Sequence, residues 1–166
     1  ALESGWISDA AISQNESERA AFWRLRESIP EAQRKHGPTL KHDISVRVSQ
    51  VPRFIEAAGA WVAQHVPQGV LVAYGHLGDE NLHFNINQRA GTAAAEFQAD
   101  EPRVKRAIHD FVRDFGGSFS AEHGIGQLKV LELERYAQPV ELDLMRRVKQ
   151  AFDPRGIMNP GKVLRS

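Results

Sequence analysis

Two segments of alternating character, joined by a glycine-containing turn, constrain the fold of this chain most. Residues 69–73 form a short apolar run, and residues 81–87 alternate Leu82, Phe84 and Ile86 with polar side chains. Strict alternation places the two sets of side chains on opposite faces of a strand. The few residues between the segments include two glycines. The sequence therefore predicts two paired strands in a tight hairpin with one apolar face.

Helical periodicity flanks this hairpin on both sides. It spans four segments: 17–29, which Pro30 ends or bends; 51–65, with Pro52 in its first turn; 102–115, after Asp100; and 139–152. Residues 40–48 alternate like a half-buried strand, 118–120 read as a short strand or link, and the tail beyond 152 is irregular. The order predicts an α+β domain with helices stacked on one face of a mostly antiparallel sheet, spanning 17–166 after an arm over 1–16. Such a start suggests a fragment.

Composition excludes several classes of protein. The 21 Lys and Arg residues balance 21 Asp and Glu residues, which disfavours nucleic acid as a partner. No apolar run approaches the ~20 residues of a membrane-spanning helix, and no signal segment opens the chain, so we expect a cytoplasmic protein. The chain has no cysteine, so a metal site would have to use histidine and carboxylate ligands.

The hairpin carries a pair of histidines. His76 ends the first strand, and His83 lies on the second strand on the face opposite the apolar residues. Two imidazoles can thus converge on one sheet face, as a half-site for a metal ion would require. The alternative is that both histidines merely form hydrogen bonds at a solvated face. The neighbouring row Asn81, Asn85 and Asn87 is typical of a wet sheet face.

A second chemical feature is Glu122 next to His123, followed by Gly124 and Gly126. Glycines allow positive φ and close backbone approach, so this segment could supply a carboxylate ligand and a titrating base together. Two histidines and one glutamate would leave a coordination position open, as catalytic metals require. Taken alone, the segment also fits a solvated turn, just as the cations Arg26 and Lys41 fit a solvated surface.

Three motifs in this order resemble the C-terminal part of the FAD-linked oxidases of the vanillyl-alcohol oxidase superfamily, which include the D-2-hydroxyglutarate, D-lactate and glycolate dehydrogenases. They are GHLGDENLH at 75–83, SAEHGIG at 120–126 and FDPRGIMNPGK at 152–162. The resemblance runs from about 22 to 164. It implies a cap domain with a ferredoxin-like sheet that closes over FAD, held mainly by a separate N-terminal domain absent here.

The resemblance also implies roles for individual residues. His76, His83 and Glu122 match the ligands of a divalent metal, zinc or manganese, and His123 matches a catalytic base. The remaining matches are substrate contacts at Arg26, Lys41 and Asn85 and an approach to the flavin by Asn159. Expected partners are thus FAD and a small 2-hydroxyacid, which would be oxidised to a 2-oxoacid; the residues name no electron acceptor.

Two positions depart from the family pattern. Glu80 stands where the family usually has glycine, and Pro30 stands where the 2-hydroxyglutarate branch has a threonine that contacts substrate. Two other functions fit the residues: a stand-alone metal-dependent hydrolase with Glu80 or His123 as base, and a non-catalytic dimerisation or ligand-binding module. A homodimer with swapped segments is also compatible with the incomplete start of the chain.

Overall fold

The computed structural model describes residues 3–5 and 7–165, and these fall into two compact units, Ala1–Gly37 and Pro38–Ser166. The first unit contains α1 (Glu16–Glu27) and α2 (Ile29–His36). Asn15 caps α1, because its Oδ1 accepts the backbone N–H of Glu18 at 3.0 Å. The predicted break near Pro30 is confirmed.

The apolar stripe predicted for α1 is not buried. Phe22 is 44% exposed and Leu25 is 70% exposed, and no residue of α1 is buried. Among its described residues, the first unit contains only two short helices that follow one another, so it has no other element against which the apolar stripe of α1 could be buried. The second helix, α2, was not predicted; it continues through His36 and is followed by Gly37, whose φ is 120°.

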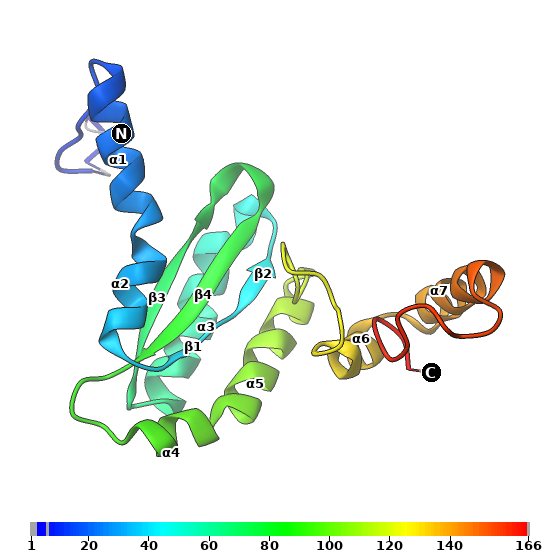
Figure 1. Cartoon of the computed structure of the whole chain (residues 1–166). Helices are drawn as coiled ribbons and strands as arrows, with labels where there is room; N and C mark the ends of the chain where they lie inside the picture. Colours follow the sequence, from blue (N-terminus) through cyan, green and yellow to red (C-terminus); the bar gives the residue numbers. More distant parts are fainter. Residues whose placement is uncertain (1–2, 6, 166) are drawn as a thin grey trace. The chain divides into compact units, whose positions relative to one another are not determined.

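The second unit is built on an antiparallel sheet with β4 (Asn81–Gln88) at its centre (Figure 1). β3 (Gly69–His76) pairs with β4 along its whole length and forms the predicted hairpin. The other edge of β4 pairs with β1 (Thr39–Leu40) and then with β2 (Asp43–Ser45). Gly75 is required in this hairpin, since a Cβ there would lie 2.0 Å from the carbonyl oxygen of Asn81.

A single strand over residues 40–48, as the alternation predicts, is wrong. The ladder is interrupted between β1 and β2, where the backbone N–H of His42 donates to Oδ1 of Asn85 at 3.2 Å instead of to a backbone carbonyl. The register does not slip across this gap, because Leu40 pairs with Ile86 and Asp43 pairs with His83. The strand also ends early, since Val48 begins the short 3-10 helix η1 (Val48–Gln50).

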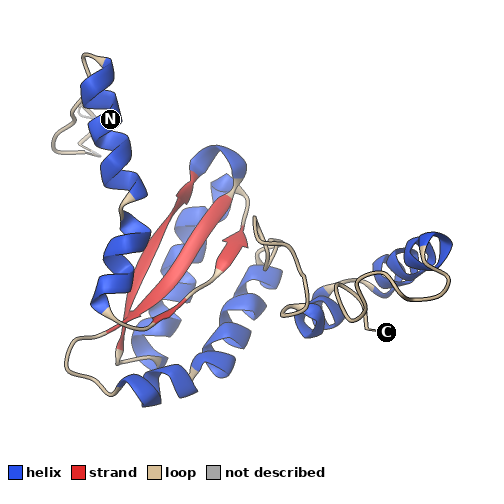
Figure 2. Ribbon diagram, viewed as in Figure 1, coloured by secondary structure: helices blue, strands red, loops and turns tan. Residues whose placement is uncertain are grey.

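Helices cover one face of this sheet and enclose the core (Figure 2). They are α3 (Val51–His65), α4 (Ala94–Ala99) and α5 (Glu101–Asp114). The apolar sides of all these elements are almost fully buried: Leu40, Ile44, Val46, Leu82, Phe84 and Ile86 from the sheet segments, with Phe54, Ala58, Val62, Phe97, Val104, Ile108 and Val112 from the helices. The predicted helices 51–65 and 102–115 are confirmed, whereas α4 was not predicted.

The order of elements fits the ferredoxin-like pattern that the family resemblance implies. β2, α3, β3, β4 and α5 follow one another along the chain, and Ser118 then forms an isolated antiparallel bridge with Ser45. The strands therefore lie in the order Ser118, β2, β4, β3, with a single bridge in place of a final strand. The predicted α+β class is confirmed.

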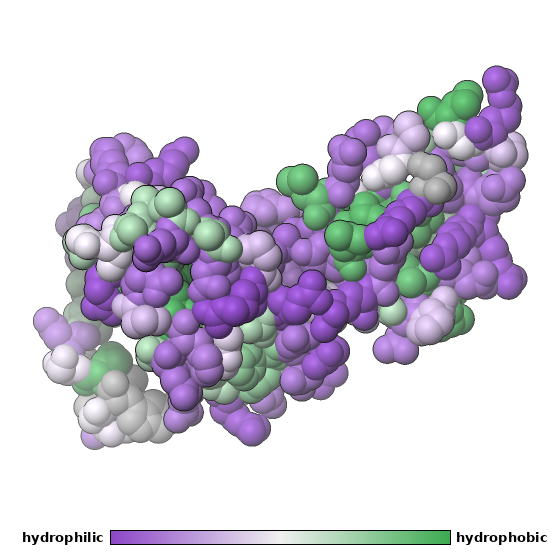
Figure 3. All heavy atoms as spheres, turned by 90° about the horizontal axis from the view of Figure 1, so that it is seen from below, coloured by the Kyte–Doolittle hydropathy of each residue, from purple (hydrophilic) through white to green (hydrophobic). Residues whose placement is uncertain are grey.

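The C-terminal part contains α6 (Val130–Tyr136), which was not predicted, and α7 (Pro139–Phe152), which was. One side of α7 is exposed, with Val140, Leu144, Val148 and Phe152 between 55% and 81% accessible. In Figure 3 apolar side chains, in green, gather on this part of the surface. An apolar face of this kind is typical of an interaction site. No described helix is long and apolar enough to span a membrane.

Candidate functional site

The predicted pair of histidines lies on the sheet face opposite the helices. His76 ends β3 and His83 lies in β4, and their ring centroids are 6.5 Å apart at an interplanar angle of 82°. Tyr74, which pairs with His83 across the hairpin, places its ring 5.0 Å from the imidazole. The alternation of β4 explains this arrangement, because Leu82 and Phe84 turn into the core on either side of His83.

Glu122 reaches this face from a distant part of the chain. Its Oε1 lies 3.6 Å from Nδ1 of His76, and Oδ2 of Asp79 lies 3.3 Å from the same nitrogen. One ligand atom from each of these three exposed residues falls within 4.8 Å of the others, which is close enough to hold one metal ion. Asp79 was not predicted, although its place in η2 (Leu77–Asp79), three positions after His76, is a local signal for it.

Asp43 connects the two predicted motifs, and it too was not predicted. Its Oδ2 accepts the backbone N–H groups of Glu122 and His123, each at 3.0 Å, and lies 3.4 Å from Nδ1 of His123. Its Oδ1 lies 3.9 Å from Nδ1 of His83. Burial raises the pKa of the Asp43 carboxyl, but these two hydrogen bonds and the charges of His123 and Lys129 outweigh burial and lower the pKa.

The asparagine row of β4 is buried rather than wet, so the expectation of a solvated face is wrong. Asn81, Asn85 and Asn87 are 4–8% exposed. Each contacts the neighbouring strand segment: Asn87 Oδ1 accepts from the hydroxyl of Thr39 at 3.2 Å, and Asn81 Nδ2 donates to Asp43 at 3.4 Å. Oδ1 of Asn81 is buried without a partner among the described residues.

The remaining predicted site residues lie in several places. Lys41 is exposed and lies between β1 and β2, where the register sets it opposite Asn85 and on the same face as His83. Arg26 belongs to α1 in the first unit. Asn159 lies in the tail with a φ of 47°, and lines a pocket of about 750 Å³ together with Phe152 and Met158 from α7 and the tail.

Glu80 adopts the backbone conformation that its departure from glycine requires, with φ 63° and ψ 5°. This left-handed conformation costs a residue with a Cβ roughly 1–2 kcal/mol. Replacement by glycine removes this strain, but part of the gain is offset because glycine loses more backbone entropy on folding. We therefore expect Glu80→Gly to raise the free energy of unfolding by about 1 kcal/mol in urea titrations. Glu80→Ala keeps the Cβ and should bring no gain; equal stabilisation by both variants would contradict this explanation.

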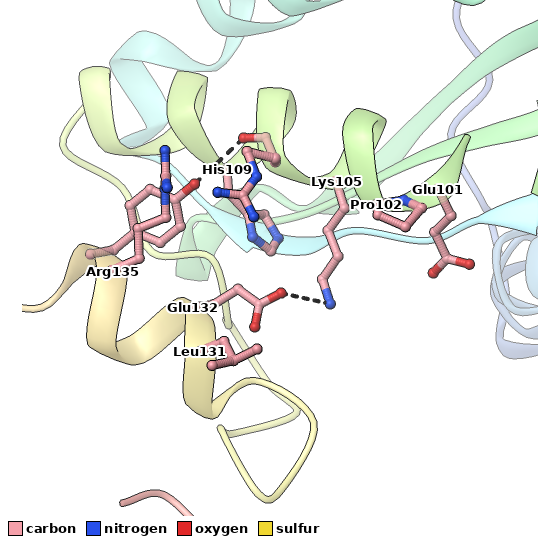
Figure 4. Close-up of a pocket in the computed structure, with 9 residues that line it drawn as sticks. Glu101, Pro102, Lys105, His109, Leu131, Glu132 and Arg135 are labelled. Carbon is pink, nitrogen blue, oxygen red and sulfur yellow. Dashed lines mark hydrogen bonds and ion pairs between the residues drawn. The ribbon is translucent and has the colours of Figure 1, made fainter. Parts of the chain in front are cut away.

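A separate pocket of about 300 Å³ lies beside α5 and α6 (Figure 4). Nζ of Lys105 and Oε1 of Glu132 form an ion pair of 2.8 Å across it. His109 of α5 also lines the pocket, is 3% exposed, and has an Nδ1 atom without a hydrogen-bond partner among the described residues. Its ring lies 6.1 Å from that of buried His42, so two imidazoles meet between the sheet and α5.

Comparison with known proteins defines the class of this chain. Its residues 1–163 match the family of FAD linked oxidases, C-terminal domain. The chain belongs to this family, and its α+β fold agrees with the motifs that pointed to it.

Individual relatives narrow the comparison. The chain is 41% identical over 162 residues to D-2-hydroxyglutarate dehydrogenase from Stutzerimonas stutzeri, covering 98% of this chain and 35% of that protein. Identity is 40% to the enzyme of the same name from Xanthomonas citri, of which it covers 34%, and 35% to the mitochondrial one from Arabidopsis thaliana, of which it covers 28%. The chain thus spans about a third of the length of these relatives or less. Because both bacterial and mitochondrial proteins match, the cytoplasmic location stays a prediction.

Proposed function

We propose that this chain is the substrate- and metal-binding part of a flavin-dependent dehydrogenase that oxidises a D-2-hydroxyacid to a 2-oxoacid. The observation that carries the proposal is that the hairpin motif with His76 and His83 meets the motif with Glu122 and His123 around Asp43 on one sheet face, in a chain of the FAD-linked oxidase family. The names of the relatives favour a 2-hydroxydicarboxylic acid such as 2-hydroxyglutarate among the candidate substrates.

The donors fit a divalent cation, zinc or manganese. As the motifs predict, His76, His83 and Glu122 would hold it. Ligand atoms of His76, Glu122 and Asp79 lie within 4.8 Å of one another, whereas His83 is outside this group, with its ring centroid 6.5 Å from that of His76. Imidazole nitrogen and carboxylate oxygen are suitable ligands for either ion, and three protein ligands leave room for substrate. Once bound, the ion would supply Lewis-acid polarisation of the substrate hydroxyl and carboxylate.

His123 is the residue we propose as the base that removes the hydroxyl proton. Its side chain is 68% exposed, and the Nδ1 side of its ring faces Asp43. A carboxylate on Nδ1 favours the tautomer that leaves Nε2 with the lone pair, so Nε2 would take the proton. FAD would accept the hydride from the substrate carbon.

The other predicted residues would orient the substrate. Lys41 lies on the same sheet face as the histidines, and its ammonium group suits a carboxylate as a point charge. Asn85, beside it, is held by His42, and Arg26 would provide bidentate binding for a second carboxylate. Asn159, whose φ is 47°, would approach the flavin from the tail.

We further propose that the exposed side of α7 packs against the flavin-binding part of the larger protein. Leu144, Val148 and Phe152 are more than half exposed, and relatives of this family carry about two thirds of their length outside the matching region. A second copy of the chain is the alternative occupant, which would give a homodimer. Light scattering on the protein with and without its flavin-binding part distinguishes the two.

Anaerobic reduction of the flavin tests the proposed function. The chain, joined to its flavin-binding part, is mixed with a panel of D-2-hydroxyacids, with and without a chelator, while the flavin absorbance is followed. Bleaching driven by one acid and stopped by the chelator supports the proposal. A protein that holds both flavin and metal but bleaches with no acid, or that hydrolyses esters without flavin, would overturn it.

A further inference from the structure

We propose that Asp43 is a positioning residue of this site: its carboxylate fixes the loop that carries Glu122 and His123 against the histidine-bearing strand β4. The roles of the residues that Asp43 positions rest on the proposed function. The positioning itself rests on the contacts of Asp43. Asp43 is not among the residues that the family motifs indicated.

The first argument is the number of loop amides that this one residue binds. Between α5 and α6 the described chain forms no helix or longer strand, only the bridge of Ser118 to Ser45. Asp43 then binds three successive amides of this loop: its backbone carbonyl accepts from Ala121 at 3.2 Å, and its Oδ2 accepts from Glu122 and His123. Hydrogen bonds to a charged acceptor are among the stronger ones in proteins.

The second argument is that the same carboxylate faces two imidazoles. Oδ2 lies 3.4 Å from Nδ1 of His123, and Oδ1 lies 3.9 Å from Nδ1 of His83. The contact to His123 is short enough for the carboxylate to favour a proton on Nδ1, which leaves Nε2 free on the opposite side of the ring. At 3.9 Å the carboxylate acts on His83 through its charge rather than through a hydrogen bond. One carboxylate therefore holds the loop, orients His123 and places a negative charge beside His83 of β4.

The third argument is the burial of the group. The side chain of Asp43 is only 5% exposed, and a carboxylate at such a position is costly unless donors surround it. Asn81, itself buried, supplies a further donor at 3.4 Å. Both loop amides donate to a single oxygen, Oδ2, so a neutral asparagine side chain at position 43 could also accept them. The negative charge of Asp43 is therefore explained by the two histidines that it faces.

Two variants separate anchoring from orientation. In the 166-residue chain, Asp43→Ala should make the amides of Glu122 and His123 exchange with solvent at least about tenfold faster. It should also weaken binding of Zn²⁺, measured by calorimetry, by about 10–100-fold. Asp43→Asn keeps an acceptor for the amides, and the orphaned Oδ1 of Asn81 can face the new NH₂ group after an amide flip. We expect Asp43→Asn to keep the amides of Glu122 and His123 protected from exchange. It should weaken Zn²⁺ binding by about tenfold and change the ring ¹⁵N chemical shifts that report the His123 tautomer.

A matched control is Asp110→Asn, which removes a carboxylate on α5 that accepts from the hydroxyl of Tyr136 at 3.1 Å, and which should leave all three readouts unchanged. Wild-type exchange and Zn²⁺ affinity in Asp43→Ala would overturn the proposal. If that variant does not fold, Asp43→Asn decides, and a wild-type His123 signature with wild-type Zn²⁺ affinity would overturn it. A wild-type chain that binds no Zn²⁺ would remove the metal from the proposed function, while amide exchange and ring signature still decide the role of Asp43.

Discussion

His123→Ala should reduce the rate of flavin reduction by about 10²–10⁴-fold, the range over which a positioned base accelerates proton transfer. The bound metal should stay near its normal amount, because His123 faces Asp43 and is not one of the proposed ligands. His83→Ala should instead lose metal and activity together. Stopped-flow reduction of the flavin and metal analysis of the purified variants provide the two measurements.

The control for this pair is His65→Ala. His65 is an exposed histidine at the end of α3, where its ring stacks on Trp61, so its loss should change neither metal content nor reduction rate. Turnover that persists in His123→Ala would remove this residue from the mechanism. A His83→Ala protein with full metal content would show that Asp79, rather than His83, completes the ligand set with His76 and Glu122.

The hairpin and its histidines could be predicted because the signals are local. Alternation over eight residues fixes which side of β4 faces the core, and the short turn fixes the pairing of β3 with β4. The two imidazoles follow from these rules without knowledge of the remaining chain. The helices α3, α5 and α7 were predicted for the same reason, since each repeats its apolar positions over several turns.

The parts that escaped prediction depend on contacts between distant segments. Asp43 meets the amides of Glu122 and His123 across 79 and 80 positions of sequence, and nothing near Asp43 indicates such partners. The burial of Asn85 has a similar origin, because its partner His42 lies 43 positions away. Short helices such as α4, with six residues, complete fewer than two turns and carry little periodicity.

Acid should destabilise this protein strongly through the buried pair His42 and His109. Burial lowers the pKa of His42 from 6.5 to about 3, partly offset by the hydrogen bond to the Phe84 carbonyl, and lowers that of His109 from 6.5 to about 4. The surrounding charges are Lys105, Lys129 and Glu132, of which the lysines favour the neutral rings and Glu132 opposes them at His109.

The sign of the effect follows from linkage between protonation and folding. Both folded-state pKa values lie below the ordinary value of 6.5, so the unfolded chain binds more protons as the pH falls below about 6.5. Stability is therefore full above that pH and is lost as the pH falls toward 4. At about pH 5 each histidine should cost about 2 kcal/mol of unfolding free energy, or about 4 kcal/mol for the pair. Urea titrations at about pH 7 and about pH 5 measure this loss.

Single replacements assign the loss to each ring. His42→Asn retains a donor near the Phe84 carbonyl without a group that titrates in this range, and His109→Leu removes the orphaned Nδ1 atom. The free energy of unfolding differs between about pH 7 and about pH 5, and each variant should reduce this difference by about 2 kcal/mol, whatever its stability near neutral pH. Replacement of the exposed His36 by asparagine should leave the difference unchanged. If His42→Asn and His109→Leu still lose the full unfolding free energy between about pH 7 and about pH 5, other titrating groups cause the loss. The neutral imidazoles between the sheet and α5 would then not limit the stability of this fold in acid.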